Sequence, residues 1–242
     1  MPALKADIIT QLKKDILALQ GFRPLIHAQH IIDLGTINHS FPDSTFPLGA
    51  NHEFICKSKE SLAATSGFIA GILSGLLKKD GAVIWISSSQ IIFPPALLTF
   101  GIEPSRIIFI HLRNQKEILW SIEEALKCEG LTAVIGEITS IDLTVSRRLQ
   151  LASEQSRVTG FILRNQPRQP TTTACVCRWQ IRHLQSDPPH ELPGVGFPRL
   201  NVELLKVRSG KPGKWQLEWN NGKFNEIRIN HSSATEEHKQ AV

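Results

Sequence analysis

Residues 56–63 stand where a phosphate-binding loop would connect a strand to a helix. The apolar run His52-Glu53-Phe54-Ile55 predicts a strand, and a helix is expected from about residue 61. A working loop of this kind curls glycine backbone N–H groups around phosphate, neutralises charge with a lysine and holds Mg²⁺ with a Ser or Thr hydroxyl. Here the turn reads Cys56-Lys57-Ser58-Lys59-Glu60-Ser61-Leu62-Ala63.

Each of the four chemical determinants is missing from this turn. When the sequence is aligned with this motif, Cys56 and Ser61 stand in place of the glycines. Leu62 stands in place of the lysine, and Ala63 in place of the Ser or Thr. The side chains at the two glycine positions hinder a close approach of backbone to phosphate. The sequence therefore predicts a degenerate loop with no catalytic residue, no bound cofactor and no metal.

Other residues of the turn leave a second interpretation open. Lys57 or Lys59 could supply positive charge from within the loop, so an ATPase with an altered phosphate loop is an alternative. Against it, Glu60 places a carboxylate near the start of the helix, where it competes with phosphate. Ser58 has the position and chemistry of an ordinary N-cap.

Basic residues gather in two stretches that could bind DNA phosphates or an acidic partner. The first stretch lies on and after a helix expected over residues 144–156, and the second lies on a hairpin. The two sets are Arg147, Arg148, Arg157, Arg164 and Arg168, and Lys206, Arg208, Lys211 and Lys214. For the helix, the alternative is a solvated face paired with Glu154. For the hairpin, Trp215, Leu217 and Trp219 either stack on single strands or, as the alternative, face the core.

The cysteines and histidines do not have the spacing of metal ligands. The four cysteines, Cys56, Cys128, Cys175 and Cys177, include no C-x-x-C pair, and we expect buried, reduced thiols of a cytoplasmic protein. The nine histidines are scattered along the chain. No metal site is expected.

The amino-acid composition indicates the broad class of the protein. The chain has 242 residues, 41% of them apolar and 20% charged, which is typical of a soluble globular protein. We find no apolar segment of a signal peptide and no run of about 18 apolar residues, so no membrane association is expected. A net charge of +5 permits weak affinity for nucleic acid.

The order of the remaining elements predicts an α/β fold. Strands are expected at residues 52–55, 82–86, 106–110, 132–135 and 159–163, and helices at 61–79, 93–100, 116–128 and 144–156. This alternation predicts a doubly wound, mainly parallel sheet. Alternating runs at 174–182, 201–207 and 215–219 predict antiparallel strands at its C-terminal edge. Gly67, Gly71 and Gly75 would let the first helix pack closely on the sheet or another helix.

The N-terminal segment carries an apolar stripe at helical spacing. Leu4, Ile8, Leu12, Ile16 and Leu19 predict a helix that docks either on its own core or on a neighbouring molecule, which includes a second copy of the chain. An irregular arm, residues 22–47, follows it. We expect a helix and arm at 1–47, a core at 48–228 and a disordered tail at 229–242.

The whole arrangement resembles the ATPase core of RecA. The stretch "AVIWISSSQIIFPPALLTFGIEPSRIIFI" is similar to the RecA strand that ends at the catalytic glutamate, and Ser89 falls at that position. "TAVIGEI" is similar to the Walker B strand, with Gly136 or Glu137 near the usual aspartate, and "VTGFILRNQ" to the strand after it. The segments that would form the DNA-binding loops of RecA are short here.

A closer resemblance is to the ImuA family, RecA-like proteins of bacterial damage-induced mutagenesis cassettes. It rests on "GANHEF", "PPALLTFGIEP", "ILWSIEEALKCEGLTAVIGEI", "SRRLQLASEQSRVTGFILR" and "LNVELLKVR" with "GKPGKWQLEW", where Leu200 replaces a Trp of the family. The resemblance implies a non-catalytic adapter in SOS-induced translesion DNA synthesis and repair. It implies as partners a Y-family-like ImuB subunit, a specialised DnaE-type polymerase and RecA. Part of the family is also described as SulA-like cell-division inhibitors, which is the alternative role.

Overall fold

The structure, a computed structural model, describes residues 11–12, 32–78, 81–89, 92–167, 171–186 and 195–227. Of the N-terminal stripe only Leu12 falls within these ranges, where it is helical and 55% exposed. Leu4, Ile8, Ile16 and Leu19 lie outside the described residues, as do Arg168 and the tail at 229–242. The expected N-terminal helix and the expected disorder of the tail therefore stay predictions.

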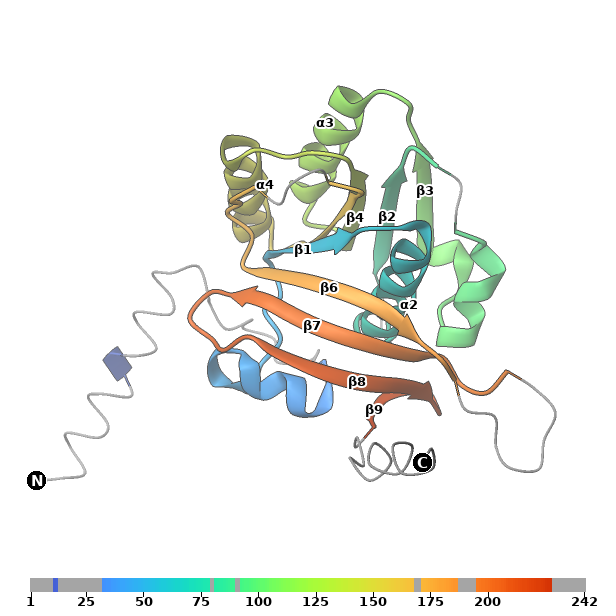
Figure 1. Ribbon diagram of the computed structural model, residues 1–242. Helices are drawn as coiled ribbons and strands as arrows, with labels where there is room; N and C mark the ends of the chain where they lie inside the picture. Colours follow the sequence, from blue (N-terminus) through green and yellow to red (C-terminus); the bar gives the residue numbers. More distant parts are fainter. Residues whose placement is uncertain are drawn as a thin grey trace, which may run out of the picture.

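Strands and helices alternate along the first two thirds of the described chain, and strands follow one another in the last third (Figure 1). The strands are β1 (Asn51–Cys56), β2 (Ala82–Ser87), β3 (Ile107–His111), β4 (Leu131–Ile138), β5 (Thr159–Asn165), β6 (Cys177–Leu184), β7 (Arg199–Val207), β8 (Gly213–Asn220) and β9 (Lys223–Glu226). The α-helices are α2 (Lys59–Leu76), α3 (Gln115–Leu126) and α4 (Leu143–Ser156). The 3₁₀ helices are η1 (Gly35–Ser40), η2 (Pro42–Ser44), η3 (Pro94–Phe100) and η4 (Pro104–Arg106).

The described strands form one nine-stranded sheet in the order β3-β2-β4-β5-β1-β6-β7-β8-β9. The pairs from β3 through β6 are parallel, and the pairs β6–β7, β7–β8 and β8–β9 are antiparallel. The expected fold class, a mainly parallel α/β sheet with antiparallel strands at its C-terminal edge, is confirmed. The arrangement is consistent with a RecA-like fold. One detail differs from the expectation, because β6 is parallel to β1 and the antiparallel edge begins only at β7.

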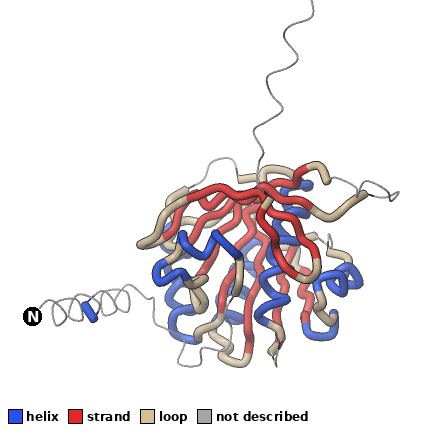
Figure 2. Tube along the Cα trace, turned by 90° about the horizontal axis from the view of Figure 1, so that it is seen from below, coloured by secondary structure: helices blue, strands red, loops and turns tan. Residues whose placement is uncertain are grey.

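Helices cover both faces of the sheet, with the strands as the central layer (Figure 2). Alternate residues of a strand point to opposite faces. On β4, Ala133 and Ile135 join the core cluster under α2, whereas Val134 and Ile138 join the cluster under α3 and α4. The strands near the middle of the sheet are thus buried on both sides, and every residue of β1 is buried.

Helix α2 is seated on an aromatic layer. Phe54 of β1, Phe68 of α2 and Trp179 of β6 pack together with ring centroids 5.7–6.4 Å apart. Gly71 faces Phe224, whose ring would lie 2.4 Å from a Cβ at that position. The expected close packing of the glycine face is therefore confirmed, and its partners are aromatic side chains from the C-terminal strands.

The described part of the expected arm, residues 32–47, packs into the same core. Ile32, Leu34, Ile37, Phe41 and Phe46 are each less than 5% exposed and belong to the cluster under α2. The segment is also tied to the C-terminal strands, because the backbone N–H of residue 211 donates to the carbonyl of residue 40. Residues from 32 onward therefore contribute apolar burial to the core that we expected to begin at residue 48.

The helix expected over residues 93–100 is present as the 3₁₀ helix η3, because two prolines open it and Gly101, at a φ of 72°, ends it after seven residues. One local expectation was wrong. Cys128, expected to be buried, is exposed at the end of α3, whereas the other three cysteines are buried and free. Among the described helices, none combines the length and apolar character needed to cross a membrane.

Candidate functional site

The connection between β1 and α2 contains only two residues. Strand β1 ends at Cys56 and α2 begins at Lys59, with Ser58 as its N-cap. The Ser58 hydroxyl accepts from the N–H of Ser61, and the Ser61 hydroxyl accepts from the N–H of Ser58, so the two serines form a capping box. The expected N-cap at Ser58 is confirmed. The cap engages the N–H of Ser61, one of the N–H groups in the first turn of α2 that a phosphate at this helix end would need.

The positions that carry glycine, lysine and hydroxyl in a phosphate-binding loop lie within α2 or at the end of β1. Ser61 and Leu62 are buried on the first turn of α2, and Leu62 is 1% exposed. Cys56 is buried, and its burial raises the pKa of the thiol to about 11. The side chain of Glu60 accepts from Ser58 and from its own backbone N–H, and these hydrogen bonds hold its carboxyl pKa below the usual value. No residue of this connection is placed to cradle a triphosphate.

Ser89 and Glu137, which the resemblance to RecA would place near catalytic carboxylates, are in contact. Ser89, just after β2, lies 3.3 Å from Glu137 Oε2, and its hydroxyl donates to that oxygen. The indole N–H of Trp85 donates to Glu137 Oε1 at 3.0 Å. Burial raises the pKa of the Glu137 carboxyl, and these two hydrogen bonds act in the opposite direction. The carboxyl is 4% exposed, so its oxygens are engaged inside the protein rather than presented to water.

A buried ionic network on β1, β5 and β6 was not foreseen. Glu53 is fully buried, and its two oxygens accept from Arg164 Nη1 at 2.9 Å and from Arg178 Nε at 2.7 Å. The hydroxyl of Thr173 donates to Glu53 Oε2 at 2.7 Å. A glutamate at the centre of the apolar run His52–Ile55 was the available signal, because a buried carboxylate requires cationic or donor partners.

Arg164 therefore does not lie on a basic surface. It was expected to join the residues around α4, but it is 2% exposed and paired with Glu53. The reason is its position on β5, where alternate residues face the interior under α4. The position of Arg164 shortly after a helix in the sequence did not show whether its side chain would be buried or exposed.

Three cationic side chains form hydrogen bonds with the backbone of the extended segment before β6. Arg178, Lys206 and Arg208 donate to the backbone carbonyls of residues 171, 173 and 174, respectively. Arg208 also lies 3.5 Å from Glu154 of α4. Glu154 also accepts from Gln150 on its own helix, and its cationic partner is a residue of the C-terminal hairpin, so the two basic stretches meet here.

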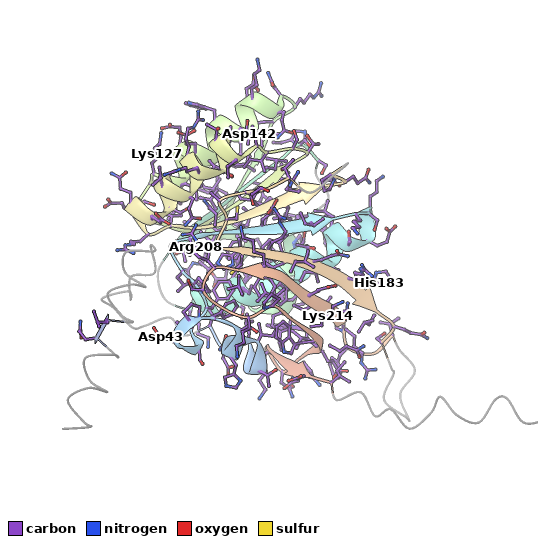
Figure 3. All side chains as sticks on the ribbon, turned by 60° about the vertical axis from the view of Figure 1, so that its left-hand side comes forward. Asp43, Lys127, Asp142, His183, Arg208 and Lys214 are labelled. Carbon is purple, nitrogen blue, oxygen red and sulfur yellow. The ribbon has the colours of Figure 1, made fainter. Side chains whose placement is uncertain are left out.

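The remaining basic side chains are distributed rather than gathered on one face. Arg148 pairs with Glu123 at 2.5 Å, and Lys214 pairs with Glu203 at 2.8 Å, away from Arg208 in Figure 3. The other basic candidates within the described residues are exposed on α4, at its C-terminus or on the β7–β8 hairpin. They are Arg147, Arg157, Lys206 and Lys211.

The aromatic residues of the hairpin contribute to the core. Leu217 is 2% and Trp219 is 8% exposed, and the Trp219 ring lies 4.8 Å from Phe224 and 5.0 Å from Phe100, centroid to centroid. Trp215 is partly buried against the same core. Of the two interpretations of this strand, the geometry favours packing over stacking on single-stranded DNA.

No group of three or more His, Cys, Asp or Glu side chains suited to a metal ion occurs in the described residues. Burial raises the pKa of the Cys175 thiol to about 12 and that of Cys177 well above its usual value. A thiol that resists ionisation is a poor nucleophile and a poor metal ligand. These cysteines act as small apolar side chains under the sheet.

These features define a class, an α/β protein whose sheet is consistent with a RecA-like fold and whose β1–α2 connection is closed by a helix cap. No family model matches the chain. It is similar to Protein ImuA of Caulobacter vibrioides, in strain NA1000 / CB15N and in strain ATCC 19089 / CIP 103742 / CB 15. Each relative is 35% identical over 195 residues, which cover 76% of this chain and 80% of the relative. The chain belongs to the ImuA family.

Proposed function

We propose that this protein is a non-catalytic adapter in damage-induced mutagenesis. It joins a Y-family-like ImuB subunit and a DnaE-type polymerase during translesion DNA synthesis, and it also contacts RecA. Membership of the ImuA family supports the pathway. The two-residue, capped connection between β1 and α2 is the observation that supports an adapter rather than an ATPase.

The geometry supports binding over catalysis for a second reason. Glu137 is the carboxylate placed most like a catalytic residue, at the carboxyl end of β4. Its oxygens already accept from Trp85 and Ser89, and burial favours its neutral form. A carboxyl whose two oxygens are engaged in this way, and which is 4% exposed, lacks the solvent access needed to activate water.

The N-terminal helix is the docking element in this proposal. Its five-residue apolar stripe would expose a large apolar area if nothing covered it, and full burial contributes roughly 1.5–3 kcal/mol per side chain. Leu12 is helical and 55% exposed, so at least this member of the stripe is not buried by the described core.

Co-purification with the two polymerase subunits tests the proposal. The full chain, a chain lacking residues 1–20, and the point variants Leu12→Asp and Gln11→Asp are each co-expressed with an ImuB-like subunit and a DnaE-type polymerase. Gln11→Asp is the matched control, because it adds the same charge to the neighbouring exposed position. We expect the truncated chain and Leu12→Asp to fold and to lose the complex, and Gln11→Asp to retain it.

Two outcomes contradict the proposal. If the full chain captures neither subunit but binds a polymerising cytoskeletal GTPase, the division-inhibitor role replaces it. If the truncated chain unfolds and the full chain is monomeric and alone, the helix belongs to its own core.

Isothermal titration with Mg·ATP tests the non-catalytic part separately. We expect no saturable heat below millimolar ATP, because the glycines, the lysine and the hydroxyl are all replaced. A micromolar dissociation constant that is lost in Lys57→Ala or Lys59→Ala would instead establish the ATPase alternative.

A further inference from the structure

A cavity of about 830 Å³ opens at the carboxyl ends of β2, β4 and β5, beside the start of α2. It lies outside the β1–α2 turn itself, of whose residues only Lys59 reaches it. Hydroxyl and amide side chains make up most of its wall. The lining residues include Lys59, Ser89, Ser140, Arg164, Asn165 and Gln166.

The cavity is positively charged. Lys59 and Arg164 line it, and none of its lining residues is acidic. The neighbouring carboxylates are already engaged, and that of Glu60, which follows Lys59, accepts from Ser58 and from its own N–H. Glu53 is shared between Arg164 and Arg178, and Glu137 accepts from Ser89 and Trp85. Arg164 and Arg178 carry two positive charges and share the single carboxylate of Glu53, so one positive charge is not neutralised and can attract an anionic ligand.

Two buried polar atoms of the lining residues have no hydrogen-bond partner. Arg164 is 2% exposed, and its Nε donor is unsatisfied although its Nη1 is paired with Glu53. Asn165, the next residue, has an unsatisfied Oδ1 acceptor. A buried polar group left without a partner costs roughly 1–3 kcal/mol, so such atoms point to a ligand or to ordered water.

We propose that this cavity binds a small ligand that carries one phosphate group and a hydroxyl group. The phosphate oxygens accept from Lys59, from Arg164 and from the hydroxyl of Ser140, and the ligand hydroxyl donates to Asn165. Inorganic phosphate carries such a hydroxyl on phosphorus, and a small sugar phosphate carries it on carbon. Sulfate has the same size and charge but no hydroxyl, and it leaves Asn165 Oδ1 unsatisfied.

The arrangement is unsuited to a long anionic chain. Glu60 follows Lys59 and holds a carboxylate at the start of α2, where its own N–H and Ser58 donate to it. A triphosphate extending along this helix end would meet that carboxylate. The ligand class is therefore small, with one phosphate.

Titration calorimetry with the full chain tests the site at constant ionic strength. The probes are inorganic phosphate, ribose 5-phosphate and sulfate. Each probe replaces chloride in the buffer, so that the ionic strength stays constant. We expect saturable binding of at least one phosphate probe, and weaker binding of sulfate. Tighter binding of ribose 5-phosphate identifies a phosphate ester as the source, and tighter binding of inorganic phosphate identifies the free ion.

Lys59→Gln and Lys57→Gln form a matched pair of variants. Both lysines are exposed and lie two residues apart, but only Lys59 lines the cavity. We expect Lys59→Gln to weaken phosphate binding by about tenfold, the effect of one charge-assisted hydrogen bond, and Lys57→Gln to leave it unchanged. Far-ultraviolet circular dichroism verifies that both variants are folded.

A third variant tests the acceptor. Asn165→Leu removes Oδ1, so phosphate should lose its advantage over sulfate while both anions still bind. The proposal is overturned if neither phosphate probe saturates, if the two lysine variants lose affinity equally, or if sulfate and phosphate bind alike in the unsubstituted chain. These results concern a small ligand and leave the adapter proposal to its own test.

Discussion

His52 is a fully buried imidazole near the middle of the sheet. Its Nε2 lies 2.7 Å from the carbonyl oxygen of Pro47, and the indole N–H of Trp179 lies 3.4 Å from its Nδ1. Its ring stacks on Phe46 at 4.4 Å between centroids. Burial lowers its pKa from 6.5 to about 4, and the hydrogen bond to Pro47 acts in the opposite direction. A neutral ring that donates from Nε2 and accepts at Nδ1 satisfies both partners.

The lowered pKa predicts a loss of stability in mild acid. Between pH 6.5 and about 4 the unfolded chain binds a proton at His52 that the folded chain does not, so the free energy of unfolding falls as pH falls. At 1.36 kcal/mol per pH unit, the loss over this window is roughly 3 kcal/mol. Above pH 6.5 both states are neutral and the contribution is constant. Urea unfolding of the full chain at several pH values measures it.

His52→Gln isolates the effect from other titrating groups. Its own stability will be lower, but the change in unfolding free energy between pH 6.5 and 4.5 should be smaller than in the unsubstituted chain. An identical pH profile in both proteins would mean that the buried ring is not the group that titrates.

The pair Glu53–Arg164 predicts a strong dependence of stability on both partners. Arg164→Met leaves Glu53 buried with only Arg178 and Thr173 as partners, and it should cost roughly 3 kcal/mol, at the low end for a broken buried pair. Adding Glu53→Gln removes the uncompensated carboxylate, so the double variant should recover part of this loss. Chemical denaturation of Arg164→Met, of Glu53→Gln and of the double variant measures the coupling. Simple additivity of the two substitutions would contradict the ionic network.

At the scale of elements, α2 shows how two glycines of one helix differ. A Cβ on Gly67 would meet Phe100 at 3.7 Å, an ordinary contact, whereas a Cβ on Gly71 would lie 2.4 Å from Phe224. The Phe224 ring is held between Phe68 and Trp219, so it cannot move aside without cost.

Gly67→Ala and Gly71→Ala should therefore change stability in opposite directions. Alanine favours a helix interior over glycine by roughly 0.5–1 kcal/mol, and this gain should appear at Gly67. At Gly71 the overpacked aromatic layer should cost about 1–3 kcal/mol. Thermal unfolding measures the stability of the two variants. A stabilised Gly71→Ala would show that α2 does not pack closely against Phe224.

Sequence patterns were sufficient for elements whose signal is local. The capping serine at Ser58 and the apolar strands of the parallel sheet were predicted because caps and hydrophobic runs are read over a few residues. The direction of β6 was missed, since pairing to β1 depends on chain that is distant in sequence. The burial of Arg164 was missed for the same reason, because its partner Glu53 is 111 residues away. The cavity could not be foreseen, as it exists only where three strand ends and one helix start converge.

At the scale of the whole molecule, the distribution of charge predicts weak DNA binding. Arg147, Arg157, Lys206 and Lys211 are exposed but spread over α4 and the β7–β8 hairpin, and Trp219 is packed in the core. Binding without a stacking platform rests on phosphate contacts and on the release of counterions. We expect low affinity for single-stranded DNA, no sequence preference and a steep fall in affinity between about 50 and 200 mM salt.

Fluorescence anisotropy with a labelled oligonucleotide at several salt concentrations measures this dependence. Replacing the four exposed residues with Gln should lower the salt slope by up to roughly 0.7 for each phosphate that is no longer neutralised, and Lys223→Gln, an exposed change on β9, should not. Tight binding that survives high salt would return the hairpin tryptophans to a functional role.

The position of β1 also determines when the molecule can fold. Both of its neighbours are late in the chain, since Glu53 meets Arg164 on one side and Arg178 on the other, at separations of 111 and 125 residues. Contacts of such long range slow folding, because a large loop must close before they form. During synthesis, β1 emerges early and has no pairing partner until β5 and β6 leave the ribosome. Until then its apolar side chains and its backbone groups are exposed, and a chain interrupted before β5 would carry an unpaired central strand.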